Sequence, residues 1–115
     1  MKVLIVEDYL PFRKLLENQL LFYVDKLNVH QAGTIEDTVN LLGQNDYHLI
    51  ILDVNLPDGY SSTLIPKIKE KNQNTIIIVL TGNSSNFIRL KVNELGADYF
   101  LDKMTDLEQL FIILK

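Results

Sequence analysis

Strand-like apolar segments alternate along this chain with segments in which apolar residues recur at helical spacing. The strand-like segments show little of the apolar–polar alternation of a half-exposed strand, as expected where both faces are buried. They fall at about 2–6, 27–31, 48–53, 75–80 and 98–101. The pattern predicts five strands, with a helix between successive strands and another after the last.

Capping and turn residues indicate where these helices begin and end. Pro11 falls in the first turn of the first helix, where its missing N–H does no harm. Gly43 and Gly96 are expected to end the second and fourth helices, because glycine commonly follows the last helical residue. The helices are expected to begin near Leu10, at Thr34, at 61–63, before Ile88, and at the Thr105–Glu108 capping box.

Alternating strands and helices predict an α/β fold in three layers, a doubly wound five-stranded parallel sheet covered by helices on both faces. With 115 residues the chain is expected to form one domain, 1–115. The last helix is short, which leaves open that it has been truncated. No output domain is expected within this span.

Composition excludes several classes of function. The net charge of −4 and the lack of a Lys/Arg cluster argue against nucleic-acid binding by this domain. No apolar run approaches the roughly 20 residues needed to cross a membrane, and the N-terminal run is too short for a signal peptide. The absence of cysteine excludes disulfides and thiolate metal sites and fits a reducing compartment. We therefore expect a cytoplasmic protein without membrane contact.

Acidic residues stand where two of the predicted strands end. The run Leu49–Leu52 leads directly into Asp53, and the run Val3–Val6 leads into Glu7 and Asp8. In an open parallel sheet, ligands bind beyond the carboxyl ends of the strands, where the strand order reverses. If these two strands are neighbours there, three carboxylates converge and repel one another, which indicates a bound cation.

Two further polar residues follow the later strands. Thr81 ends the fourth predicted strand, and Lys103 comes directly after the fifth. Carboxylates, a hydroxyl and an ammonium at one edge suit phosphoryl transfer to a carboxylate. Mg²⁺ prefers oxygen ligands, Asp53 can act as nucleophile, and Lys103 and Thr81 can donate to phosphoryl oxygens.

With these residues in this order, the chain resembles the receiver domain of two-component response regulators over essentially its whole length. The residues that carry the resemblance are the Glu7–Asp8 pair, Asp53 in DVNLPDG, Thr81, and Lys103 after GADYFLD. The resemblance implies a flavodoxin-like fold with strand order 2-1-3-4-5. It also implies that Asp53 accepts a phosphoryl group from a sensor histidine kinase or a phosphotransfer protein, and that phosphorylation switches a partner-binding surface.

The resemblance further implies a metal site for Mg²⁺ or Mn²⁺. Asp8 would bind the ion directly and Glu7 through water, with Asp53 and the backbone carbonyl of Asn55 as the other protein ligands. One position departs from the family: Met104 stands where a proline, preceded by a cis peptide bond, usually follows the lysine. The geometry of this loop is therefore left open.

Other roles are implied beside the phosphorylation site. Thr81 and Phe100 would form the switch, with the ring turning inward when the threonine moves toward the phosphoryl group. Asn55 and Asn83 lie two residues after Asp53 and Thr81 and would flank the phosphoryl group. The alternative is that the two amides only make hydrogen bonds within turns.

Each of these residues also has a purely structural interpretation. An aspartate before a turn, such as Asp53, often only caps that turn. Glu7 and Asp8 could cap the first helix and oppose its dipole. His30 and His48 stand at strand boundaries away from the acidic edge, and we expect both to be structural.

Apolar residues off the buried helical stripes indicate a partner surface. Phe87 and Leu90 lie off the stripe of the fourth helix, and Ile112 and Ile113 lie off that of the fifth. Together with the fifth strand they would contact a second copy or an output domain. The alternative is that truncation has exposed residues that are otherwise covered.

Two rival functions remain open. A Mg²⁺-dependent phosphohydrolase would use Asp53 as a transient nucleophile, but such enzymes commonly carry a second acid where this chain has Asn55. A non-phosphorylated pseudo-receiver would be an interaction module, although an unneutralised acidic cluster would destabilise it.

Overall fold

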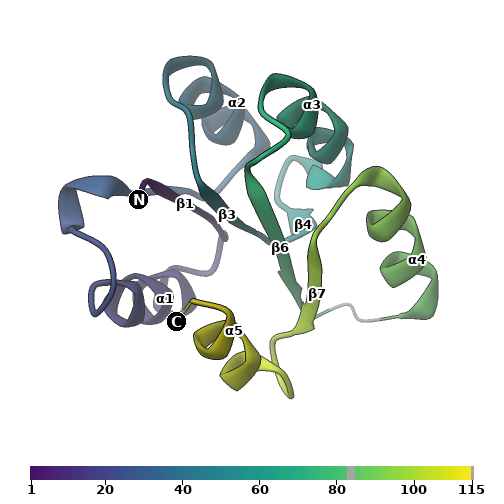
Figure 1. Ribbon diagram of the computed structural model, residues 1–115. Coiled ribbons are helices and arrows are strands. Elements are labelled where there is room, and N and C mark those ends of the chain that lie inside the picture. Colours follow the sequence, from purple (N-terminus) through teal and green to yellow (C-terminus); the bar gives the residue numbers. More distant parts are fainter. Residues whose placement is uncertain (83–84, 115) are drawn as a thin grey trace.

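The computed structural model describes residues 1–82 and 85–114, and the predicted flanking residue Asn83 lies outside them. Helices and strands alternate along the chain (Figure 1). The strands of the main sheet are β1 (Val3–Val6), β2 (Val29–Ala32), β3 (Leu49–Leu52), β6 (Ile76–Thr81) and β7 (Tyr99–Asp102). The helices are α1 (Leu10–Leu20), α2 (Ile35–Gln44), α3 (Leu64–Lys71), α4 (Asn86–Leu95) and α5 (Leu107–Leu114). Two short strands, β4 (Asn55–Leu56) and β5 (Gly59–Tyr60), and two 3₁₀ turns, Lys26–Asn28 and Ser61–Thr63, complete the described elements.

The main sheet is parallel, with the order β2-β1-β3-β6-β7. Counted along the chain within this sheet, the order is 2-1-3-4-5, so the predicted fold is confirmed. Val6 is in register with Leu52, so β1 and β3 end at the same level. The residues that follow these two strands are therefore brought side by side at one edge. The antiparallel hairpin β4–β5, just beyond that edge, was not predicted.

Helices cover both faces of the sheet, α1 and α5 on one and α2, α3 and α4 on the other (Figure 1). Alternate strand residues enter different cores: Ile5 packs in the core with α1 and α5, whereas Leu4 packs in the core with α2, α3 and α4. Both are completely buried. Burial on both faces explains why the strands lack polar alternation.

Side-chain caps begin two of the helices near their predicted limits. Thr34 Oγ1 accepts a hydrogen bond of 3.0 Å from the third residue of α2. Gly96, with φ of 114°, ends α4 as predicted. The predicted end of α2 at Gly43 is wrong, because the helix runs on to Gln44. There the side chain of Asn45 donates to a free carbonyl of the last turn, which ends the helix one residue later.

The predicted exposure of the last helix is correct for Ile112 but not for Ile113. Ile112 is 62% exposed, whereas Ile113 is half-buried and packs against the core beneath α5. Ile113 follows Leu110 by three positions, so the two side chains share one face of the helix. Within the described part of the chain, no helix has the length and apolar character needed to cross a membrane.

Candidate functional site

Glu7 and Asp53 lie side by side at the carboxyl edge of the sheet. Each continues the backbone hydrogen bonding of its strand: Glu7 N donates to Ala32 O, and Asp53 N donates to Val6 O, both at 2.9 Å. Glu7 is 1% exposed and Asp53 is 6% exposed. The sheet therefore holds two buried carboxylates next to each other, where only specific partners can stabilise their charge.

Asp8 completes an acidic cluster with these two residues. One carboxylate oxygen from each of Glu7, Asp8 and Asp53 lies within 4.8 Å of the others, and Asp8 is exposed to solvent. Three carboxylates at this spacing repel one another unless a cation lies among them. Hard divalent ions such as Mg²⁺ and Ca²⁺ bind carboxylate oxygens and keep water ligands on an open side. The donor set therefore fits such an ion.

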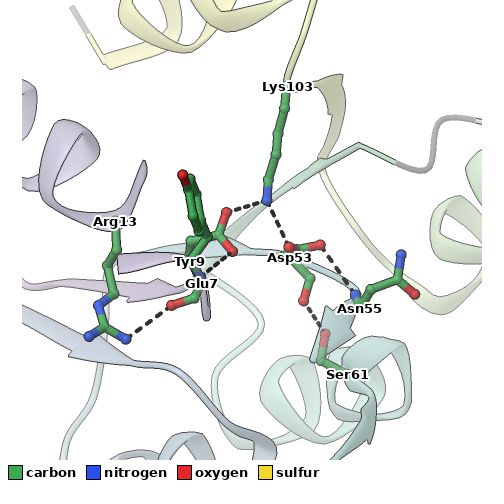
Figure 2. Close-up of polar contacts among 7 residues, drawn as sticks. All are labelled: Glu7, Tyr9, Arg13, Asp53, Asn55, Ser61 and Lys103. Atoms are coloured by element: carbon green, nitrogen blue, oxygen red, sulfur yellow. Dashed lines mark hydrogen bonds and ion pairs between the residues drawn. The ribbon is translucent and has the colours of Figure 1, made fainter. Parts of the chain in front are cut away.

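Lys103 supplies positive charge to this cluster (Figure 2). Its ammonium forms an ion pair with Glu7 and donates a hydrogen bond of 2.8 Å to Asp53 Oδ2. Its backbone N–H donates to Thr81 O at 3.1 Å, so the end of β6 positions the residue. The ammonium also lies 5.0 Å from the centre of the Phe12 ring, within cation–π range.

Burial, hydrogen bonds and neighbouring charges shift the pKa values of Glu7 and Lys103. Burial raises the pKa of Glu7, although the hydrogen bond and charge of Lys103 act to lower it. Burial acts to lower the pKa of Lys103, but hydrogen bonds and charges of Asp53 and Glu7 outweigh it and raise that pKa. Lys103 is therefore an ammonium at neutral pH, and one cation neutralises two neighbouring carboxyl groups only in part.

Beyond the backbone hydrogen bond to Val6, the carboxylate and the carbonyl of Asp53 make three further contacts (Figure 2). Lys103 binds Oδ2, and the backbone N–H of Asn55 donates to Oδ1 at 3.2 Å. The hydroxyl of Ser61 donates to the backbone carbonyl of Asp53 at 2.5 Å. The contact with Asn55 is the turn cap of the structural interpretation, so Asp53 caps its turn and also lies within the acidic cluster.

Further hydrogen bonds hold the loop that follows β1. Tyr9 N donates to Glu7 Oε2 at 3.3 Å, so Glu7 contributes to the start of α1 as the structural interpretation predicts. Arg13 Nη1 donates to Glu7 O at 3.0 Å (Figure 2). Gly33 leaves space for this guanidinium, because a Cβ built there would lie 2.8 Å from Arg13 Nη1. Glycine at this position allows Arg13 to hold the acidic loop.

The two predicted switch residues lie on neighbouring strands. Thr81 is completely buried at the end of β6, and Phe100 is half-buried on β7. The Arg89 guanidinium lies 4.7 Å from the centre of the Phe100 ring. The ring packs against the core on one side of the sheet and lies next to Arg89 of α4.

Met104 gives the last loop a contact that proline cannot make. Met104 N donates to Asp102 Oδ1 at 2.7 Å, and no cis peptide bond occurs in the described ranges 1–82 and 85–114. The Lys103–Met104 bond is therefore trans. A proline lacks this N–H, and here the backbone hydrogen bond orders the loop that carries Lys103.

The two histidines lie elsewhere and have structural contacts. His30 Nδ1 lies 2.7 Å from Tyr47 Oη, with the two rings edge to face. Lys2 N donates to His48 Nδ1 at 2.9 Å, at the amino end of β3. Both contacts agree with the structural roles expected for these residues.

Three contributors near the site were missed in the sequence. Ser61 and Arg13 hold the backbone of Asp53 and Glu7, as described above. Asp58 Oδ1 accepts from Ile35 N at 2.8 Å, which joins the turn after Asp53 to the start of α2. Hydrogen bonds from backbone N–H groups, the largest effect coming from that of Ile35, lower the pKa of Asp58. The LPDG segment indicates a turn, but no local pattern reveals which distant helix that turn caps.

Comparison with known proteins agrees with this arrangement. The family model "Response regulator receiver domain" matches residues 3–115. The transcriptional regulatory protein PmrA of Pectobacterium parmentieri is 33% identical over 112 residues, which cover 96% of this chain and 49% of PmrA. The chain spans about half the length, or less, of curated relatives that it matches.

Solved structures agree with the family match. The BeF₃-activated receiver domain of DrrB has a TM-score of 0.87 and 30% identity, and the match covers 98% of this chain and 92% of that one. A response regulator from Burkholderia pseudomallei, solved with a phosphorylated aspartic acid and a calcium ion, has a TM-score of 0.86 and 25% identity. That match covers 99% of this chain and 66% of the Burkholderia chain.

Proposed function

This chain belongs to the response regulator receiver family of two-component signal transduction, and we propose that its phosphoacceptor is Asp53. The observation that carries the proposal is the convergence of Glu7, Asp8 and Lys103 on that one buried carboxylate. The Burkholderia pseudomallei relative was solved with a phosphorylated aspartic acid. The phosphodonor would be a phosphohistidine on a sensor kinase or phosphotransfer protein, and the proposed location of the reaction is the cytoplasm.

The proposed reaction transfers a phosphoryl group to the carboxylate of Asp53. An Asp53 oxygen attacks phosphorus, the bond between phosphorus and the histidine nitrogen breaks, and the imidazole leaves. Lys103 contacts Asp53 Oδ2 and would remain beside the phosphoryl oxygens as a positive charge. Thr81, at the end of the neighbouring strand, would donate its hydroxyl to another of these oxygens.

The acidic cluster would hold Mg²⁺, or Mn²⁺, during this reaction. Asp8 is the exposed member and would bind the ion directly, whereas Glu7 is paired with Lys103 and would act through water. Asp53 and the backbone carbonyl of Asn55 would complete the protein ligands. When bound, the ion neutralises charge on the transferred group. The calcium ion of the Burkholderia relative supports a divalent cation in this role.

Phosphorylation would then alter a partner surface. The modification adds roughly −1.5 to −2 charge beside Thr81 and Lys103, and a movement of Thr81 would change the space available to Phe100. Beyond Phe100, the exposed apolar residues Phe87 and Leu90 on α4 and Ile112 on α5 form the proposed contact surface. A second copy or an output domain would bind there.

Labelling with a small phosphodonor tests the assignment. Wild-type protein in Mg²⁺ should take up one acid-labile phosphoryl group, and Asp53→Asn should take up none. Asp58→Asn is the matched control, because Asp58 lies five positions later but on the exposed turn that caps α2. Undiminished labelling of Asp53→Asn would move the acceptor elsewhere. Repeated turnover of a small phosphate ester would instead favour the hydrolase. A protein that binds neither Mg²⁺ nor beryllofluoride would favour the pseudo-receiver.

A further inference from the structure

Ser61 ties the chain that follows Asp53 back to Asp53 itself. The residue is completely buried, and its hydroxyl donates to Asp53 O at 2.5 Å. Its backbone N–H donates to Val54 O at 3.0 Å. One residue therefore binds the two consecutive carbonyls that come directly after β3, and Figure 2 shows the first of these contacts beneath the carboxylate.

These contacts close the loop that lies beyond the strand. Between Asp53 and Ser61 the chain forms the β4–β5 hairpin, in which Asn55 pairs with Tyr60. Because Ser61 follows this hairpin, its two hydrogen bonds join the returning chain to the departing one. The position of Asn55, whose N–H donates to Asp53 Oδ1, therefore depends on Ser61 as well.

Few other contacts fix the orientation of the Asp53 carboxylate. The Asn55 N–H contact is long, at 3.2 Å, and Lys103 is a flexible side chain shared with Glu7. A side chain on a poorly held backbone would change its position relative to an incoming phosphorus atom. Misplacement by about 1 Å can slow a reaction on the order of a hundredfold, so the backbone contact with Ser61 matters for the reaction.

We propose that Ser61 is a positioning residue: its buried hydroxyl holds the backbone of Asp53 so that the carboxylate stays between Lys103 and the Asn55 N–H. The inference rests on the proposed phosphorylation of Asp53 and adds to it a residue that does not touch the phosphoryl group. Ser61 acts only through the backbone of the acceptor and of the hairpin that follows.

The neighbouring serine provides a matched control. Ser62 is also buried, at 7% exposure, and lies in the same 3₁₀ turn. Across residues 1–82 and 85–114, no hydrogen bond of the Ser62 hydroxyl is found. Ser61→Ala and Ser62→Ala therefore remove the same atom from adjacent buried positions, but only the first removes a contact with Asp53.

The test measures the rate of phosphorylation by a small phosphodonor at saturating donor and saturating Mg²⁺. Ser61→Ala should be slower than wild type by about tenfold, within the range expected for a displaced reacting group, and Ser62→Ala should stay within twofold. Ser61→Thr keeps the hydroxyl and should recover most of the rate. In ¹⁵N NMR spectra, Ser61→Ala alone should shift the Asn55 amide resonance.

The outcomes separate this inference from the proposed function. No labelling of wild-type protein would refute the phosphorylation of Asp53. Normal labelling of wild type with an equal rate in folded Ser61→Ala would overturn the role of Ser61 alone, as would equal slowing in both alanine variants. If Ser61→Ala does not fold, Ser61→Cys replaces it: an intermediate rate is expected from its weaker donor, and a wild-type rate overturns the inference.

Discussion

The Lys103 ammonium lies 2.8 Å from Asp53 Oδ2, although the two residues are 50 positions apart in the sequence. The same ammonium is paired with Glu7. Lys103 thus forms ion pairs with two of the three carboxylates that would hold a divalent cation. Its charge offsets part of the repulsion between these carboxylates and opposes the binding of a further cation beside them.

Replacing Lys103 with methionine should therefore tighten Mg²⁺ binding. Methionine keeps much of the side-chain length and removes the charge, so the ion no longer competes with an ammonium for Glu7 and Asp53. A charge a few ångströms away is worth on the order of 1 kcal/mol at a partly exposed site, or roughly fivefold in the dissociation constant. Isothermal titration calorimetry measures this constant. Weaker binding would show that the lysine organises the cluster instead of competing for it.

The same substitution should destabilise the metal-free protein. Without the ammonium, Glu7 and Asp53 keep their burial and lose their shared partner, and breaking a buried ion pair costs about 3 kcal/mol. Urea denaturation in EDTA should show this loss, and saturating Mg²⁺ should reverse most of it. Lys91→Met, on the exposed surface of α4, is the control and should change neither stability nor Mg²⁺ affinity.

Glu7 should make stability depend on pH in the metal-free protein. Burial raises its pKa above the ordinary value of 4.5, so the folded state holds this proton more tightly than the unfolded state does. The free energy of unfolding contributed by Glu7 therefore falls as pH rises from 4.5 toward the folded pKa. Glu7→Gln should remove this decline. Denaturation curves across this range should differ in slope between the two proteins, whereas Glu94→Gln, on the exposed face of α4, should follow wild type.

The sheet and its acidic edge follow from the sequence because both depend on local patterns. The runs Val3–Val6 and Leu49–Leu52 are apolar throughout, since helices cover both faces of each strand. A carboxylate directly after such a run must lie at the carboxyl edge of the sheet. Whether two such carboxylates lie next to each other depends on the strand order. The family resemblance implies that order, and the pairing of β1 with β3 confirms it.

The residues that hold the backbone of the site could not be predicted, because their contacts form only when distant elements pack together in the folded chain. A serine before a predicted helix, such as Ser61, has the same appearance as an ordinary N-cap. Arg13 lies on a helix surface, and only the fold reveals that its guanidinium reaches the carbonyl of Glu7. The exposure of Ile113 was mispredicted for a similar reason, because the rotation of a short helix over its core is decided by packing.

Gly33→Ala should weaken metal binding without unfolding the protein. The added Cβ would meet Arg13 Nη1 at 2.8 Å, and the flexible guanidinium can move away. That movement breaks its hydrogen bond with Glu7 O and loosens the loop that carries Asp8. We expect the Mg²⁺ dissociation constant to rise by roughly three- to tenfold, equivalent to one hydrogen bond of about 1 kcal/mol.

Gly43→Ala is the matched control for Gly33→Ala. Gly43 lies within α2 and has no atom within 4 Å of an added Cβ, so this variant should gain about 0.5–1 kcal/mol of stability. Its Mg²⁺ affinity should be that of wild type. Combining Gly33→Ala with Arg13→Met should add little to either change alone. Full additivity in this double-mutant cycle would mean that glycine acts on the site by another route.

Arg89 should bias the position of the Phe100 ring. Its guanidinium lies 4.7 Å from the ring centre, and a cation–π contact at a partly exposed site is worth about 0.5–1 kcal/mol. Arg89→Met removes this attraction and keeps an apolar side chain beside the ring. If the contact stabilises only the observed ring position, the substitution should change the ratio of ring conformations by roughly two- to fivefold.

The Phe100 ring resonances, followed by NMR during titration with beryllofluoride and Mg²⁺, measure this ratio. In Arg89→Met the free protein should already be shifted part of the way toward the beryllofluoride-bound spectrum. Among the described residues, no cation–π contact joins Lys91 to Phe100, so Lys91→Met removes a charge from the same helix and should resemble wild type. Identical Phe100 resonances in free Arg89→Met and free wild type would show that the guanidinium packs against the ring without influencing where it lies. The coupling between Thr81 and the partner surface would then have to act on another side chain of β7 or α4.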